Sequence, residues 1–164
     1  ILKTKGDQNY GDAYRLHVNN INLPLNDVGK IADVNIPPEG AAGRYDGKSV
    51  IYSSGFLMSG VTNGEMWSNG EASSSRIEDY VAGSIDPNDS TNVISKGIFV
   101  VKSSDPPFGD SWQEWADAVQ GGAYFYDGDG DGVYNPVDLN GNGKWDPDED
   151  MPDLLGDETV WCVY

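Results

Sequence analysis

Acidic side chains are concentrated in one segment of the chain, YDGDGDGVYNPVDLNGNGKWDPDED at positions 126–150. Between Tyr126 and Glu158 there are eleven acidic residues and one lysine, a net charge of −10 out of −17 for the whole chain. A run of like charge repels itself and stays disordered unless cations neutralise it. The regular alternation of Asp or Asn with Gly indicates a site for a hard metal ion, and the alternative is a solvated acidic linker.

Two overlapping 12-residue frames match the EF-hand type of calcium loop, which takes ligands from positions 1, 3, 5, 7, 9 and 12 and has glycine at position 6. The first frame supplies Asp127, Asp129, Asp131, the Val133 carbonyl, Asn135 and Asp138, with Gly132 at position 6. The second supplies Asp138, Asn140, Asn142, the Lys144 carbonyl, Asp146 and Glu149, with Gly143 at position 6. Because Asp138 belongs to both frames, one carboxylate could bridge two ions.

The ligand types predict calcium. Calcium takes six to eight oxygens at about 2.3–2.6 Å, whereas magnesium prefers water and a tighter octahedron. Zinc and copper prefer His and Cys, and neither residue is near the segment. A third, weaker frame uses Asp146, Asp148, Asp150 and Asp157, but Met151 occupies its glycine position. We therefore expect two calcium ions, and a third only if this last frame also closes.

The predicted calcium sites have the features of structural sites. A calcium sensor needs helices on both sides of a loop so that binding can swing them apart. Here GGAYFY precedes the first loop, nothing separates it from the second, and the third frame contains prolines. The ions are expected to make the segment rigid. Weak sites, with Kd of about 10⁻⁴–10⁻³ M, are filled outside cells, which favours a secreted location.

The elements that must position these loops are predicted to be mostly β-strands. The chain has 21 Gly and 9 Pro, which favours many turns. Alternating apolar and β-branched residues predict strands at 15–25 (with a bulge or bend at Asn19–Asn20), 30–36, 49–60, 64–73, 92–103 and 158–164. Thr62-Asn63-Gly64 predicts a tight turn. We expect one β-rich domain over residues 1–164, an antiparallel β-sandwich or jelly roll that contains the tandem loops at 126–158.

One amphipathic helix is predicted at about 111–120. Ser111 and Glu114 have the spacing of a capping box, and Gly121-Gly122 is expected to end the helix. An apolar stripe at helical spacing consists of Trp112, Trp115, Ala116 and Val119. Such a stripe is expected to pack against the sheet rather than to form an aromatic ligand platform.

The sequence argues against several classes of function. No basic patch is present for nucleic acid or an anionic membrane surface, and no apolar run approaches the roughly 20 residues of a membrane span. An enzyme is not expected, because His17 stands alone and no nucleophile or phosphate-loop motif occurs. Cys162 is expected to be a buried small residue, with an intermolecular disulfide as the alternative.

The stretch DGDGDGVYNPVDLNGNGKWDPDED resembles the overlapping calcium repeats of thrombospondin type 3 and dockerin modules. A longer stretch, from SSDPPFGDSWQEW to ETVWCVY, resembles the N-terminal region of large secreted surface proteins of Bacteroidetes and Ignavibacteria that use type IX secretion. The resemblance implies export and calcium binding, and little about activity. Those proteins usually continue further, so Tyr164 is expected to be a cut end.

The expected function is therefore that of a calcium-stabilised secreted structural protein at the cell surface or outside the cell, which assembles with copies of itself into a filament, tube or surface layer. The alternative is a calcium-dependent carbohydrate-binding or adhesion module of a larger secreted protein. In that case Trp67 or Tyr80 would contact the glycan, and the discriminating feature would be a shallow groove with two coplanar aromatic rings.

Overall fold

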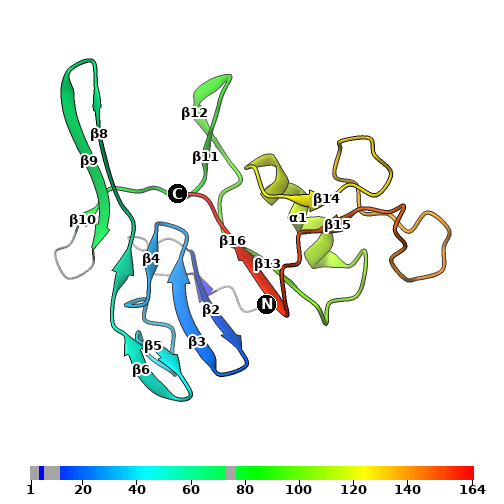
Figure 1. Cartoon of the computed structure of the whole chain (residues 1–164), viewed down its shortest axis with the longest axis horizontal. Coiled ribbons are helices and arrows are strands. Elements are labelled where there is room, and N and C mark those ends of the chain that lie inside the picture. The colour runs from blue at the N-terminus through cyan, green and yellow to red at the C-terminus, as the bar shows by residue number, and fades with distance from the viewer. Residues whose placement is uncertain (1–3, 6–11, 73–76) are drawn as a thin grey trace. The chain divides into compact units, whose positions relative to one another are not determined.

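The computed structural model describes residues 4–5, 12–72 and 77–164. The protein is mostly β, with antiparallel sheets and one helix in the described residues, as predicted. Its contacts divide it into two compact units, which are Ile1–Ala82 with Val163–Tyr164, and Gly83–Cys162. Figure 1 shows the elements of both units along the chain. The acidic segment lies entirely in the second unit.

Two separate sheets make up the described part of the first unit. Its strands are β1 (Thr4–Lys5), β2 (Asp12–Val18), β3 (Ile21–Asn26), β4 (Lys30–Ile31), β5 (Gly43–Tyr45), β6 (Lys48–Ile51), β7 (Ser54–Gly55), β8 (Leu57–Thr62), β9 (Glu65–Ala72) and β10 (Ile77–Glu78). One sheet has the order β1-β2-β3-β4-β7, with β5 on β3 and β6 on β5. The other has the order β10-β9-β8, and β8 and β9 form its long hairpin (Figure 1).

The predicted strand at 15–25 is a hairpin rather than one bulged strand. Val18 at the end of β2 pairs with Ile21 at the start of β3, which leaves Asn19 and Asn20 as a two-residue turn. Asn19 has φ 50°, the left-handed conformation that asparagine tolerates better than most residues. The phase slip in the apolar pattern therefore marks a reversal of the chain and not a bulge.

Other predicted strands are also interrupted. The predicted 30–36 strand keeps only Lys30–Ile31, because Ala32 and Asp33 have φ 60° and 54°. The 49–60 segment is divided among β6, β7 and β8, whereas the hairpin turn at Asn63-Gly64 is confirmed by the pairing of β8 with β9. Residue 73, at the end of the predicted 64–73 strand, lies outside the described residues.

A buried ion pair lies within the first unit. The Lys30 side chain is 3% exposed, and its Nζ lies 2.7 Å from Glu78 Oε1 and 3.5 Å from Glu71 Oε1. Glu71 is also buried. Burial raises the pKa of the Glu71 carboxyl, and the positive charge of Lys30 opposes that rise.

The second unit combines three two-stranded ladders with the helix. Its elements are β11 (Ser84–Asp86), β12 (Asp89–Ile94), β13 (Phe99–Lys102), α1 (Asp110–Gln120), β14 (Phe125–Tyr126), β15 (Met151–Pro152) and β16 (Glu158–Trp161). The antiparallel pairs are β11 with β12, β13 with β16, and β14 with β15. The predicted 92–103 strand is divided between β12 and β13, because Ser95 and Gly97 have φ 53° and 123°. The predicted 158–164 strand is regular only over β16.

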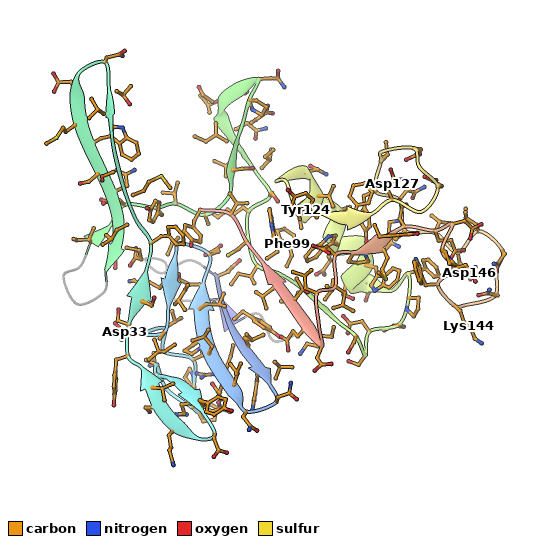
Figure 2. All side chains as sticks on the ribbon, in the orientation of Figure 1. Asp33, Phe99, Tyr124, Asp127, Lys144 and Asp146 are labelled. Carbon is orange, nitrogen blue, oxygen red and sulfur yellow. The ribbon has the colours of Figure 1, made fainter. Side chains whose placement is uncertain are left out.

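The helix packs its tryptophans into the core of the second unit, as predicted. Trp115 is 1% exposed, and its Nε1 donates a hydrogen bond to the Tyr124 carbonyl at 3.0 Å. The other members of this apolar cluster include Phe99, Val101, Ala118, Ala123 and Tyr134, with Ala116 and Val119 partly buried against it. Figure 2 shows Phe99 and Tyr124 near the helix. No helix in the described residues is long and apolar enough to cross a membrane.

The predicted capping box is wrong. The N-cap residue is Gly109, and no side chain caps the helix. The Gly109 carbonyl accepts the amides of Trp112 and Gln113, so the helix begins at Asp110 and includes Ser111. Ser111 therefore lies inside the first turn, where its hydroxyl cannot take the N-cap role.

Candidate metal centre

A short ladder closes the base of the acidic segment. β14 and β15 pair with Phe125 opposite Pro152 and Tyr126 opposite Met151. Continued by one residue, this register places Asp127 opposite Asp150. The first and last acids of the segment are therefore brought together, although 22 residues separate them in the sequence.

The first loop follows β14 and folds around the Asp127 carboxylate. Asp127 Oδ1 accepts the Gly130 amide at 2.9 Å, and Oδ2 accepts the Gly132 amide at 3.0 Å. Asp129 and Asp131 each accept an amide two residues further along, at 3.1 and 2.7 Å. Gly130 and Gly132 have positive φ, so they supply the tight turns that the frame requires. The loop is labelled by Asp127 in Figure 2.

Asp150 closes this loop from the far end of the segment. It is 2% exposed, and its two oxygens accept the amides of Gly128 at 3.0 Å and Asn135 at 2.7 Å. Carboxylate oxygens of Asp127, Asp129 and Asp150 all lie within 4.8 Å of one another. No Lys, Arg or His of the described residues forms a salt bridge with any of the three. Three mutually repelling carboxylates without a basic partner could hold a metal ion.

The second loop repeats the pattern of the first. Asp138 Oδ1 accepts the amides of Gly141 and Asn142 at 2.7 and 3.1 Å, and Oδ2 accepts that of Gly143 at 2.7 Å. These bonds lower the pKa of the Asp138 carboxyl, with the Gly143 amide as the largest cause. The side-chain amides of Asn140 and Asn142 both donate to Asp146 Oδ2 at 2.7 Å. Lys144 and Asp146 mark this loop in Figure 2.

Glu149 has the same place in the second loop that Asp150 has in the first. Glu149 is 2% exposed and accepts the amides of Leu139 at 2.7 Å and Asp146 at 2.9 Å. Leu139 and Asp146 are positions 2 and 9 of the second frame, and Gly128 and Asn135 are positions 2 and 9 of the first. Two consecutive acids therefore close two successive loops. The 12-residue template expects Asp138 to close the first loop, whereas the structure has Asp150 at that place.

Aromatic side chains anchor both loops. Tyr134 is buried, and its hydroxyl donates to the Trp112 carbonyl of the helix at 2.8 Å. Burial, and less strongly the negative charge of Asp150, raise the pKa of the Tyr134 hydroxyl, so it remains a donor. Trp145 donates from Nε1 to the Glu149 carbonyl at 2.9 Å and packs edge-on against Tyr126. The loops are thus attached to the core of the second unit and to its β14 strand.

The predicted ligands divide between the two loops. Asp127, Asp129, Asp131, Val133 and Asn135 lie in the first, and Asp138, Asn140, Asn142, Lys144, Asp146 and Glu149 lie in the second. The third frame is not brought together: Asp150 belongs to the first loop, Asp146 to the second, and Asp148 and Asp157 are exposed. Asp127, Asp129 and Asp150 are the only such close group of acids, His or Cys in the described ranges. The sequence signal for Asp150 was its membership of the third frame.

Comparison of the chain with protein-family models, with curated proteins and with solved structures gave no match.

The first unit carries a different kind of surface feature. An open polar pocket of about 530 Å³ is lined by residues that include His17, Asn22, Glu39, Arg44 and Ser49. His17 itself is exposed on β2.

The two aromatic residues considered for glycan binding, Trp67 and Tyr80, are engaged differently. The Nε1 of Trp67 donates to Thr62 Oγ1 at 3.0 Å, while Tyr80 packs against Tyr164 at an interplanar angle of 58°. The ring pairs identified among the described residues are inclined by 48–78°, so none of them is coplanar.

Proposed function

We propose that this chain is a calcium-stabilised secreted structural protein, a self-assembling subunit of an extracellular filament, tube or surface layer. The observation that carries the proposal is the trio of Asp127, Asp129 and Asp150, whose oxygens converge at the closed base of two successive loops. A cation there would offset the repulsion of the trio and join the two ends of the segment.

The donor chemistry favours calcium. The trio offers carboxylate oxygens, and the loops add asparagine and backbone oxygens at the positions where calcium loops carry ligands. The single His and the single Cys of the chain, His17 and Cys162, lie outside the acidic segment, which disfavours zinc and copper. An open loop of this kind suits the larger and more variable coordination shell of calcium better than that of magnesium.

The surroundings of the loops favour a structural role for the ions. A two-stranded ladder flanks the segment, and α1 ends at Gln120, ahead of β14. A pair of helices that calcium could open is therefore not part of this arrangement. With free calcium at about 100 times Kd, one site adds about 2.7 kcal/mol to the free energy of unfolding. Extracellular calcium is sufficient for such sites even when they are weak.

The experiment that tests this function is measurement of the particle mass by light scattering, in millimolar calcium and after excess chelator. Particles far above 17.7 kDa that disperse on chelation support a calcium-dependent subunit, provided that added calcium restores them and added magnesium restores them only weakly or not at all. A monomer of 17.7 kDa in all conditions contradicts self-assembly. Calorimetric titration in the same buffers tests calcium binding separately, since a protein can bind calcium without assembling.

The second candidate is a calcium-dependent carbohydrate-binding module. The observation that favours it is the polar pocket with His17, Asn22 and Arg44, because amide and guanidinium groups form hydrogen bonds with sugar hydroxyls. It lacks support from a coplanar aromatic pair among the described residues. Retention on immobilised glycans that Arg44→Ala abolishes would favour this module over a structural subunit.

A further inference from the structure

Strand β8 has an unpaired edge. It is the outer strand of the sheet ordered β10-β9-β8, and no strand in the described ranges pairs with its other side. Its register with β9 runs from Leu57 opposite Gly70 to Thr62 opposite Glu65 without a bulge. Natural sheets protect such edges with Lys, Pro, a bulge or a covering segment. The sequence LMSGVT contains no Lys and no Pro, and Leu57 and Val61 are 73% and 65% exposed.

The pairing with β9 determines which backbone groups of β8 remain available. The Glu71 amide donates to the Phe56 carbonyl at 3.0 Å, so Phe56 faces β9. Hydrogen-bonding residues alternate along an antiparallel strand, so Met58, Gly60 and Thr62 also bond to β9. The amides and carbonyls of Leu57, Ser59 and Val61 therefore point to the open edge, where three residues offer six hydrogen-bonding groups.

We propose that this edge pairs with β8 of a second copy, antiparallel about a two-fold axis at Ser59. In this register Ser59 faces Ser59 of the second copy, and Leu57 of each copy faces Val61 of the other. All three pairs are of the hydrogen-bonded type, so each available amide meets an available carbonyl. The two apolar side chains on the same face also meet across the junction, which is favourable in a sheet. The inference specifies the self-association in the proposed function and rests on it.

The uncharged sequence along this edge allows a second copy to be the occupant. Each chain carries −17, so most approaches of two copies bring like charges together. The stretch SSGFLMSGVTNG at 53–64 contains no charged residue. The first charged residue beyond it, Glu65, belongs to β9 and pairs with Thr62, so it lies on the side of β8 away from the second copy. An isologous two-fold contact also needs only one self-complementary strand, which β8 provides.

A proline substitution tests whether this edge is the contact. Ser59→Pro removes an amide that points away from β9, so the hairpin keeps its ladder while the central pair of the interface loses both hydrogen bonds. The matched control is Ser59→Thr, which retains the amide and suits a strand. Light scattering in millimolar calcium is expected to show that Ser59→Pro raises the dimer dissociation constant at least tenfold, and that Ser59→Thr changes it less than threefold. Equal assembly of Ser59→Pro and the parent chain overturns the proposal.

Cross-linking tests the register and does not depend on the proline variant folding. In a Cys162→Ser background, Ser59→Cys places two thiols on residues with Cα atoms about 5.5 Å apart, which a disulfide can span. Val61→Cys places them about 14 Å apart at about 3.4 Å per residue. Oxidation is expected to link Ser59→Cys at least tenfold faster than Val61→Cys. Equal rates, or no link at Ser59 in a chain that assembles, overturn the register. A parent chain that stays at 17.7 kDa contradicts the self-association itself, and so both proposals.

Discussion

Replacement of Asp150 by alanine separates the role of this carboxylate in the fold from its role in binding an ion. Without calcium, Asp150→Ala leaves the amides of Gly128 and Asn135 without their acceptor. A hydrogen bond to a charged group contributes about 1.5–3 kcal/mol. Relief of the repulsion from Asp127 and Asp129 offsets part of the loss of two such bonds, so we expect a net cost of about 2 kcal/mol in chelator.

With calcium present, the cost of the same substitution should increase. One ion at about 100 times its Kd adds about 2.7 kcal/mol to the parent chain, and the variant lacks this contribution if the trio binds the ion. The total difference is then about 5 kcal/mol. Urea unfolding followed by tryptophan fluorescence measures it, because four of the five tryptophans lie in the second unit. The control is Asp148→Ala, which removes an exposed carboxylate two residues away and should cost the same with calcium and with chelator.

An equal cost of Asp150→Ala with calcium and with chelator would refute the reasoning, because it would mean that Asp150 does not contact an ion. Calorimetric titration adds a second criterion. Asp150→Ala is expected to lose one of two calcium ions, and Asp138→Ala to lose the other one. Loss of both ions in Asp138→Ala would instead support a carboxylate that bridges the two sites, as the overlapping frames suggest.

Three further predictions concern groups around the loops and in the first unit. Tyr134→Phe removes the hydrogen bond to the helix carbonyl and should lower the free energy of unfolding by about 1 kcal/mol in urea titration, and an unchanged value would show that the hydroxyl does not anchor the loop. Gly128→Ala would place a Cβ 2.3 Å from the Glu149 carbonyl oxygen, so the base of the segment must open. Calorimetry should then show that calcium affinity falls at least tenfold, and a near-normal affinity would contradict the prediction. Burial raises the folded-state pKa of Glu71 above the ordinary 4.5, so ionisation of this carboxyl lowers the free energy of unfolding. Glu71→Gln should therefore have the same free energy of unfolding as the parent chain below pH 4.5 and a higher one as the pH rises through the folded pKa. Denaturant titrations at several pH values measure this difference, and a pH-independent difference would contradict the prediction.

The loops themselves could be predicted from the sequence because their geometry is local. The alternation of Asp and Gly determines which amides lie within reach of Asp127 and Asp138, and the structure has those hydrogen bonds at the expected glycines. Asn63-Gly64 was predictable for the same reason, since a two-residue turn depends on its own dihedral angles. The mostly β character and the helix near 111–120 followed from periodicity.

What could not be predicted depends on partners that are distant in the sequence. The place of Asp150 follows from the register of β14 with β15, which no 12-residue window contains. The early end of β4 depends on positive φ at Ala32 and Asp33, and alanine gives no local signal for that conformation. The capping box failed because the N-cap is Gly109, whose carbonyl accepts two helical amides, and the helix begins at Asp110, ahead of Ser111.

The position of Asp150 implies an order of events along the growing chain. If residues 138–149 were removed, Asp150 would be position 12 of a loop that begins with Asp127 as position 1. The second loop is therefore inserted into the first, just before the last acid of the first loop. During synthesis, the inner loop has all its acids once Glu149 has emerged, and the outer loop must wait for the following residue. With ions bound as proposed, the loop that begins second would be complete first. A chain interrupted between these two neighbours would therefore carry one ion and a disordered outer loop.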